Sequence, residues 1–227
     1  MKINGAIFDL DGTLVDSMIW WETIWDVVSR AHFDGKPCRP DRETEEKLHT
    51  LAVGESVKLL CGYYAEKMGV VIDAADLERT LNDDIDDLYR NRLKTKRGVP
   101  EFLSYLHQKG IPICVASASE RENVEIALAC CGLDRFVSHI FTCTEVGKSK
   151  SYPDIYYTAR NTLGTPMEST WVFEDAYRAI CTATAAGFHT VGIYEAQESH
   201  YDEMKQTATV YVDRWESMEK LIPLFEM

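Results

Sequence analysis

Two aspartates near the start of the chain, Asp9 and Asp11, are spaced for chemistry. They are separated by one residue and directly follow an apolar, β-prone run, Ile3–Phe8. An ionised carboxylate at the edge of an apolar core is costly unless a cation or hydrogen-bond donors hold it. The chemistry available to such a pair is a nucleophilic aspartate beside a second aspartate that acts as acid and base, with a magnesium ion neutralising the charge. Because a lone Asp-x-Asp is more often a solvated turn, this interpretation depends on further residues.

The residues after position 98 alternate between β-rich runs and helical patterns. Together with Ile3–Phe8, the predicted strands are Ile111–Ala116, Ile140–Cys143, Thr170–Phe173, Thr190–Ile193 and Thr209–Val212. The predicted helices are Val99–Gln108, Arg121–Cys131, Asp154–Leu163, Tyr177–Ala186 and Glu198–Gln206. This alternation predicts an α/β fold, a doubly wound parallel sheet with helices on both faces.

Residues 17–96 interrupt this alternation. They have almost no strand signal, and the stretches within them that have helical spacing are Met18–Ala31, Glu43–Leu51, Ser56–Met68 and Asp76–Leu93. An insertion of this size after the first strand is too long for a simple crossover. We therefore predict a core domain of residues 1–16 and 97–227 and an inserted helical cap domain of residues 17–96. The expected linkers lie near Asp16–Ser17 and Thr95–Gly98.

Polar residues follow the ends of three more predicted strands. Ligands of open α/β sheets bind at the carboxyl ends of the strands, near the point where the strand order reverses. The segment Val115–Ser119 offers a hydroxyl and turn amides, Val146–Asp154 offers a lysine before a helix, and Glu174 and Asp175 end a further strand. Carboxylates suit a hard cation, and a hydroxyl with an ammonium suits an anion. We expect these elements to converge with the two aspartates at one site.

In this order, the elements resemble the haloacid dehalogenase superfamily of phosphotransferases, in the subgroup with a small helical cap inserted after the first motif. The residues that carry the resemblance are Asp9-Leu10-Asp11-Gly12-Thr13, Ser117, Lys150 and Glu174-Asp175. The resemblance covers essentially the whole chain. It implies that Asp9 is the nucleophile that takes the phosphoryl group, and that Asp11 protonates the leaving oxygen and later activates water.

The resemblance also implies binding roles. Ser117 and Lys150 would bind the oxygens of the transferred phosphoryl group. The implied substrate-binding residues are Gly12, Thr13, Ser117, Ala118 and Lys150. The implied ligands of Mg²⁺, the expected cofactor, are Asp9, the backbone carbonyl of Asp11, Asp175 and, directly or through water, Glu174. An all-oxygen site of this kind suits magnesium better than zinc.

The lysine element departs from the family pattern, which reads roughly GKPxPD. Here the segment reads Gly147-Lys148-Ser149-Lys150-Ser151-Tyr152-Pro153-Asp154. Counting forward from Gly147 selects Lys148, whereas counting back from the Pro-Asp pair selects Lys150. Because the Pro-Asp pair begins the following helix, we assign the role to Lys150.

The composition limits the partners and the compartment. The 227 residues include 24 Lys and Arg against 37 Asp and Glu, a formal charge of −13. Such a surface repels phosphate backbones and anionic membranes, so neither nucleic acid nor a membrane is an expected partner. The seven cysteines form no CxxC pair and are interpreted as reduced core thiols. Without a recognisable signal peptide or membrane span, the expectation is a cytoplasmic protein, as a monomer or weak dimer.

Three further clusters have both a structural and a functional interpretation. Trp20, Trp21 and Trp25 are predicted to pack the cap, with an apolar wall over the leaving group of the substrate as the alternative. A run of basic residues is predicted to form a solvated helix face. The alternative is that one or two of them meet a carboxylate or a second phosphate of the substrate. The run consists of Arg90, Arg92, Lys94, Lys96 and Arg97. The acidic run Asp83–Asp87 lacks the glycine and spacing of a calcium loop and is assigned to a solvated face. The six histidines show no metal-ligand spacing.

Within the superfamily, the residues favour a phosphatase. Dehalogenases do not need the second aspartate or the metal carboxylates, and phosphonatases replace the second aspartate. β-Phosphoglucomutase has a second motif similar to Val115–Ser119, but it carries a cap histidine where this chain places Trp21. We therefore predict a Mg²⁺-dependent phosphomonoesterase of a small phosphorylated metabolite, whose cap closes over the substrate. The alternatives are a β-phosphoglucomutase-like mutase and a catalytically silent binding protein.

Overall fold

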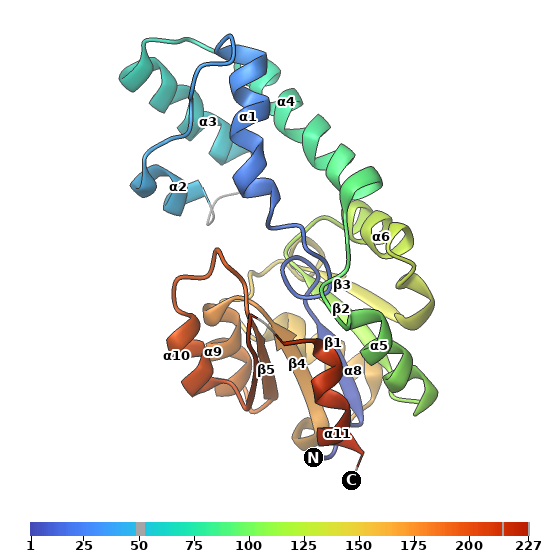
Figure 1. Cartoon of the computed structure of the whole chain (residues 1–227). Helices are drawn as coiled ribbons and strands as arrows, with labels where there is room; N and C mark the ends of the chain where they lie inside the picture. The colour runs from blue at the N-terminus through green and yellow to red at the C-terminus, as the bar shows by residue number, and fades with distance from the viewer. Residues whose placement is uncertain (49–52, 215, 227) are drawn as a thin grey trace. The chain divides into compact units, whose positions relative to one another are not determined.

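The computed structural model describes residues 1–48, 53–214 and 216–226, and it is built around a six-stranded sheet. The strands are β1 (Gly5–Phe8), β2 (Ile113–Ser117), β3 (His139–Thr142), β4 (Thr170–Glu174), β5 (His189–Ile193) and β6 (Val210–Val212). Their order is β3-β2-β1-β4-β5-β6, and every pairing is parallel (Figure 1). The predicted doubly wound parallel sheet is confirmed, and its strand ends differ from the predicted ends by at most two residues.

Helices pack on both faces of this sheet. They are α5 (Val99–Gln108), α6 (Arg121–Cys130), α7 (Cys143–Val146), α8 (Asp154–Leu163), α9 (Tyr177–Ala185), α10 (Tyr201–Thr207) and α11 (Ile222–Phe225), with short 3₁₀ turns η3 (Asp134–Phe136), η4 (Met167–Ser169) and η5 (Met218–Leu221). Successive residues of β1 point to opposite faces. Ile7 packs with Ile155 of α8 in one buried cluster. The ring of Phe8 lies 6.3 Å from that of Phe102 in α5, which lies 6.2 Å from Phe225 of α11.

Two elements differ from the predicted boundaries for local reasons. Helix α10 begins at Tyr201 rather than Glu198, because the Glu198 carboxylate accepts backbone hydrogen bonds from Tyr177 at 2.9 Å and His200 at 2.7 Å. The third predicted strand was expected to end at Cys143, but Cys143 is instead the first residue of α7. There Thr142 and Glu145 form a capping box, which begins a new helix directly after β3.

Contacts divide the chain into two compact units, Met1–Met18 with Tyr89–Met227, and Ile19–Leu88. Residues 17–18 and 89–96, which the sequence pattern assigns to the cap, therefore belong to the unit that contains the sheet. The reason is main-chain pairing between the two linkers. Asp16 N–H donates to the carbonyl of Lys94 at 2.8 Å, and Lys96 N–H donates to that of Leu14 at 2.9 Å.

The second unit is helical in its described part. Its elements are α1 (Trp20–His32), α2 (Arg42–Leu48), α3 (Val53–Tyr63), the π-helix η1 (Tyr64–Met68) and α4 (Ala74–Asp87). The π-helix η2 (Leu88–Arg92) follows, and all of it except Leu88 belongs to the unit that contains the sheet. Trp25 is buried in the core of this unit and Trp20 packs against that core, as predicted. The Trp25 indole N–H also donates to Glu45 Oε1 at 2.9 Å. The structure does not describe the side chain of Trp21 or the residue His49. The end of the helix predicted over Glu43–Leu51 also lies outside the described residues.

The interpretation of the cysteines as core thiols is only partly correct. All seven are free, and Cys38 and Cys114 are buried, but the others are half-buried except for Cys130, which is exposed. Cys130 ends α6, where its thiol reaches the carbonyl of Arg90 at 3.6 Å. Its place in the last turn of α6, away from the buried face of Val124 and Leu128, explains the exposure.

The charged runs lie mostly at the surface. Of the acidic run in α4, Asp84 is half-buried and the other aspartates are exposed. Of the basic run, every member is exposed except Lys96. Lys96 forms an ion pair with the buried Glu195 and also donates to the carbonyl of Tyr194 at 3.4 Å.

Candidate active site

The carboxyl ends of β1 and β4 bring two of the predicted acids together. β1 lies between β2 and β4, where the strand order reverses. Phe8 pairs in register with Phe173, and the Asp9 N–H donates to the carbonyl of Phe173 at 2.9 Å. Asp9 and Glu174, the next residues on each strand, therefore lie side by side although 165 positions separate them (174 minus 9).

Asp9, Glu174 and Asp175 form a buried acidic cluster. Each residue is at most 8% exposed, and each offers a carboxylate oxygen that lies within 4.8 Å of the others. No other trio of His, Cys, Asp or Glu among the described residues has this spacing. The Asp11 carboxylate is not part of the trio. Three clustered hard oxygen donors fit a small divalent cation such as Mg²⁺.

Lys150 is the cation that the chain itself supplies to this cluster. Its ammonium contacts Asp9 Oδ1 and lies 2.6 Å from Glu174 Oε1, while the Tyr156 hydroxyl donates to the same Oε1 at 3.0 Å. Lys148, the other candidate of the lysine segment, instead pairs with Asp154 at 2.7 Å, and those two side chains are 50% and 37% exposed. The structure therefore brings Lys150, and not Lys148, to the acids.

The cluster holds more negative charge than Lys150 can neutralise. Burial, reinforced by Glu174 and Asp11, raises the pKa of Asp9 to about 8 despite the opposing effect of Lys150. Burial and the neighbouring Asp9 and Glu174 also raise the pKa of Asp175 well above its usual range. Burial alone would lower the pKa of Lys150, but the two carboxylates beside it outweigh burial and raise that pKa. A bound cation or bound protons must therefore balance the cluster.

The metal-free protein should lose stability as the pH rises. The pKa of Asp9 rises from its ordinary 3.8 to about 8 on folding. The stabilisation from the proton held in the folded state is therefore complete below about pH 4 and is lost as the pH rises through about 8. In EDTA we expect the Tm to fall by several degrees between about pH 5.5 and about pH 8.5.

Asp9→Asn should reduce that slope, because the amide does not titrate. Asp16→Asn, the same change at an exposed aspartate, should retain the slope of the wild type. Thermal unfolding followed by circular dichroism measures the three slopes. Parallel slopes for Asp9→Asn and the wild type would contradict the expectation.

Asp11 lies in a separate environment made of hydroxyl groups. The Ser17 hydroxyl donates to its Oδ1 at 2.6 Å, and the Tyr89 hydroxyl donates to the same oxygen. The Ser119 hydroxyl donates to Oδ2 at 2.6 Å, and the Ser119 backbone N–H donates to Ser117 Oγ at 3.0 Å. The Asp11 carboxylate thus accepts hydrogen bonds from three neutral hydroxyl groups, whereas the acidic cluster around Asp9 is paired with the charged ammonium of Lys150.

The loop after Asp11 positions the acids through its backbone. Gly12 has a positive φ of 78°, and its N–H donates to the carbonyl of Val15 at 2.9 Å. A Cβ on Gly12 would lie 2.2 Å from Asp175 Oδ2. The next residue, the buried Thr13, donates its hydroxyl to Asp175 Oδ1 at 3.3 Å. This loop therefore requires glycine both for its conformation and for its close approach to Asp175.

Gly12→Ala should be destabilising for two separable reasons. The positive φ costs about 1–2 kcal/mol for any L-residue, and the new methyl group must also displace the Asp175 carboxylate. Gly110→Ala is the matched control, because Gly110 has a φ of 69° and a methyl group added there would meet no atom within 4 Å. Urea unfolding should show a larger loss of stability for Gly12→Ala, and equal losses would refute the steric argument.

The predicted substrate-binding residues divide between these two environments. Gly12 and Thr13 lie against Asp175, Lys150 contacts Asp9, and Ser117 is buried at the end of β2. Ala118 is exposed beside Ser117.

Sequence reasoning missed four residues that contact the site. They are Ser17, Tyr89, Ser119 and Tyr156. The two serines fall inside or beside the quoted motifs and could have been found there. Nothing in the local sequence marks the two tyrosines, because their hydroxyls reach the acids only through the tertiary fold.

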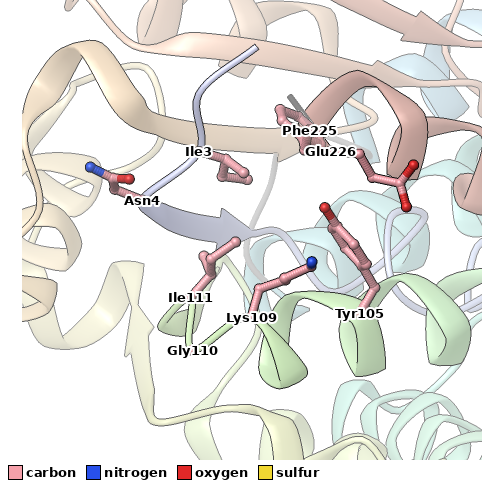
Figure 2. Close-up of a pocket in the computed structure, with 8 residues that line it drawn as sticks. All are labelled: Ile3, Asn4, Tyr105, Lys109, Gly110, Ile111, Phe225 and Glu226. Atoms are coloured by element: carbon pink, nitrogen blue, oxygen red, sulfur yellow. The ribbon is translucent and has the colours of Figure 1, made fainter.

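A cavity lies at the end of the sheet opposite to the acidic cluster. Its volume is about 300 Å³, and Figure 2 shows the residues that line it, among them Tyr105, Lys109 and Glu226. Ile3 and Ile111 of its wall precede β1 and β2, so it lies at the amino ends of the strands. It has a single carboxylate among its lining residues and therefore offers no cation site like that at the carboxyl ends.

The fold and the site together define a doubly wound α/β protein with a buried acidic site at the carboxyl edge of its sheet. Residues 3–187 match the haloacid dehalogenase-like hydrolases, and the chain belongs to that family. None of the described helices combines the length and hydropathy needed to cross a bilayer.

Several proteins of known name are similar to this chain in sequence or in structure. Validoxylamine A 7′-phosphate phosphatase of Streptomyces hygroscopicus subsp. limoneus is 28% identical, over 83% of this chain and 84% of that protein. Hexitol phosphatase A of Escherichia coli strain K12 is 27% identical, over 85% and 84%. CbbY from Rhodobacter sphaeroides, crystallised with phosphate, has the same fold with a TM-score of 0.73 and 22% identity over 96% of each chain. Two of these relatives are phosphatases by name, and the family to which this chain belongs is one of hydrolases.

Proposed function

We propose that this chain is a Mg²⁺-dependent phosphomonoester hydrolase of a small phosphorylated metabolite, acting through a phosphorylated Asp9. The observation that carries the proposal is the division of the two aspartates of the motif. Asp9 shares a buried cluster with Glu174, Asp175 and Lys150, whereas three hydroxyl groups hold Asp11. Two carboxylates in distinct environments suit two distinct roles.

In the first half-reaction, an oxygen of Asp9 attacks the phosphorus atom. The bond between phosphorus and the leaving oxygen breaks, and Asp11 gives its proton to that oxygen. In the second half-reaction, water attacks the phosphorus of phosphorylated Asp9 while Asp11 takes a proton from the water. The bond to Asp9 then breaks, and inorganic phosphate leaves.

Lys150 and the end of β2 are suited to hold the transferred group. The Lys150 ammonium already contacts Asp9 Oδ1, so it lies within reach of phosphoryl oxygens attached there. Fixed positive charge in a buried site stabilises the negative charge that spreads over those oxygens in the transition state. We assign a second contact to Ser117, buried at the end of β2, with further contacts from the turn of Ala118.

Mg²⁺ fits the three clustered carboxylates. Asp9 and Asp175 would hold it, with the backbone carbonyl of Asp11 and with Glu174 directly or through water. When bound, the ion neutralises the acids and the phosphoryl oxygens that they would otherwise repel. The raised pKa values of Asp9 and Asp175, caused first by burial, support a need for such a cation.

The names of the relatives support small phosphorylated metabolites as substrates. We extend this substrate class, but no single compound, to the present chain. The formal charge of −13 supports the exclusion of nucleic acid and anionic membranes as partners. Seven free thiols support a reducing, cytoplasmic location, and a monomer or weak dimer is our expectation in solution.

A screen of phosphorylated metabolites with Mg²⁺ tests this proposal. We expect phosphate release from sugars, polyols, nucleotides or small acids, loss of activity in EDTA, and a phosphorylated Asp9 peptide by mass spectrometry after rapid quenching. Activity that persists in EDTA would overturn the mechanism. A product phosphorylated at a new position, with activation by a bisphosphate, would instead identify a mutase, and no turnover of any substrate would identify a binding protein.

A further inference from the structure

Tyr89 is a buried tyrosine to which the proposed mechanism gives no role. It lies in η2, one of the two π-helices of the described chain, directly after α4. Short π-helical segments are rare and occur frequently at functional sites. The residue is 7% exposed, and its hydroxyl donates to Asp11 Oδ1, 78 positions away along the chain. This contact joins the return linker to the proposed acid–base carboxyl.

The Tyr89 hydroxyl has the properties of a fixed donor. The hydroxyl belongs to a buried residue and donates directly to Asp11 Oδ1. A tyrosine ring has few rotamers, and this one is enclosed. The donor is therefore held in place better than a hydroxyl on an exposed, flexible side chain would be.

Counting the acceptor sites of Asp11 shows an asymmetry between its two oxygens. Each carboxylate oxygen accepts about two hydrogen bonds. Ser17 and Tyr89 together fill Oδ1, whereas Oδ2 accepts only the hydrogen bond from Ser119. The donors among the described residues thus leave one hydrogen-bond acceptor position of the Asp11 carboxylate unfilled, and that position is on Oδ2.

We propose that Tyr89 is a positioning residue that, with Ser17, saturates Asp11 Oδ1 and so makes Oδ2 the oxygen that gives and takes the proton in turnover. The inference rests on the proposed function, because it assumes that Asp11 transfers a proton to the leaving group. Tyr89 acts through its hydrogen bond to Asp11. Its contribution is to fix the plane of the carboxyl and to leave one defined oxygen for the proton.

The experiment compares full-length wild type and Tyr89→Phe with Mg²⁺ on aryl phosphates that range from 4-nitrophenyl phosphate to phenyl phosphate. A poor leaving group needs the proton in the transition state, whereas 4-nitrophenolate leaves with little help. We expect Tyr89→Phe to lower kcat/KM for phenyl phosphate by about 10- to 100-fold and kcat/KM for 4-nitrophenyl phosphate by less than about threefold. The ratio kcat/KM reports the first half-reaction, whereas kcat also contains the hydrolysis of phosphorylated Asp9, which is the same step for every substrate. A purely structural role would lower activity equally on every substrate.

Tyr105→Phe is the matched control. Tyr105 lines the cavity at the amino ends of the strands (Figure 2), so removal of its hydroxyl should change neither the rates nor their leaving-group dependence. If Tyr89→Phe fails to fold, Ser17→Ala opens the same oxygen of Asp11 and must show the same leaving-group dependence.

The outcomes distinguish a failure of the Tyr89 role from a failure of the phosphatase proposal. Equal losses on all aryl phosphates, or no loss, in Tyr89→Phe would overturn the role of Tyr89 while the phosphatase proposal stands. A wild type that is inactive on these aryl phosphates and on every metabolite of the screen would overturn the phosphatase proposal itself.

Discussion

Asp9→Asn is expected to abolish turnover, by about 10⁴-fold or more, while the fold is retained. The amide has nearly the same shape as the carboxylate but is not a nucleophile. The change also removes one acid from a buried cluster in which burial raises the pKa of Asp9 to about 8. We therefore expect the metal-free variant to be at least as stable as the metal-free wild type at about pH 8. Unchanged or higher stability would show that the loss of activity comes from the missing nucleophile and not from unfolding.

Steady-state phosphate release and thermal unfolding in EDTA measure the two halves of this prediction. Asp16→Asn is the control, since it makes the same chemical change at an exposed residue seven positions further on and should retain full activity. Activity of Asp9→Asn within about tenfold of the wild type would exclude Asp9 as the nucleophile. A variant that is both inactive and strongly destabilised would show that Asp9 is needed for folding instead.

Lys150→Met should reduce both activity and metal-free stability. The Lys150 side chain is 13% exposed and pairs with two carboxylates, and breaking a buried pair by removing one partner costs about 3–5 kcal/mol. Loss of a charge that stabilises the transition state costs about 10²- to 10³-fold in kcat. Mg²⁺ should restore part of the stability, because it also neutralises the acids, but it should not restore the rate.

Lys148→Met is the matched variant for this prediction. Lys148 and Asp154 form an exposed pair, with side chains 50% and 37% exposed, and such pairs contribute about 0–1 kcal/mol. The expected result is therefore near-normal activity and stability, measured by phosphate release and by urea unfolding with and without Mg²⁺. If Lys148→Met were the inactive variant and Lys150→Met the active one, the assignment of the lysine would be reversed.

Most of the fold could be predicted from local patterns. The strand in front of Asp9 is a continuous apolar run because β1 is buried on both faces, and the same holds for β2 and β4. The prediction was less accurate where a side chain far along the chain changes the local structure. Glu198 binds the backbone at Tyr177 instead of beginning a helix, and pairing of Asp16 with Lys94 moves both linkers into the unit of the sheet.

The sequence alone determined which acids belong together at the site. Asp9, Glu174 and Asp175 each stand at the end of an apolar strand, and ends of parallel strands meet at one edge of a sheet. The sequence also favoured Lys150 over Lys148, because the Pro-Asp pair begins the following helix, and the structure places Lys150 against the acids. Only the tertiary structure decided which hydroxyls hold Asp11, since Tyr89 is 78 positions from its partner. Strand ends follow from local hydrophobic pattern, whereas a side-chain hydrogen bond depends on the packing of distant segments to within a fraction of an ångström.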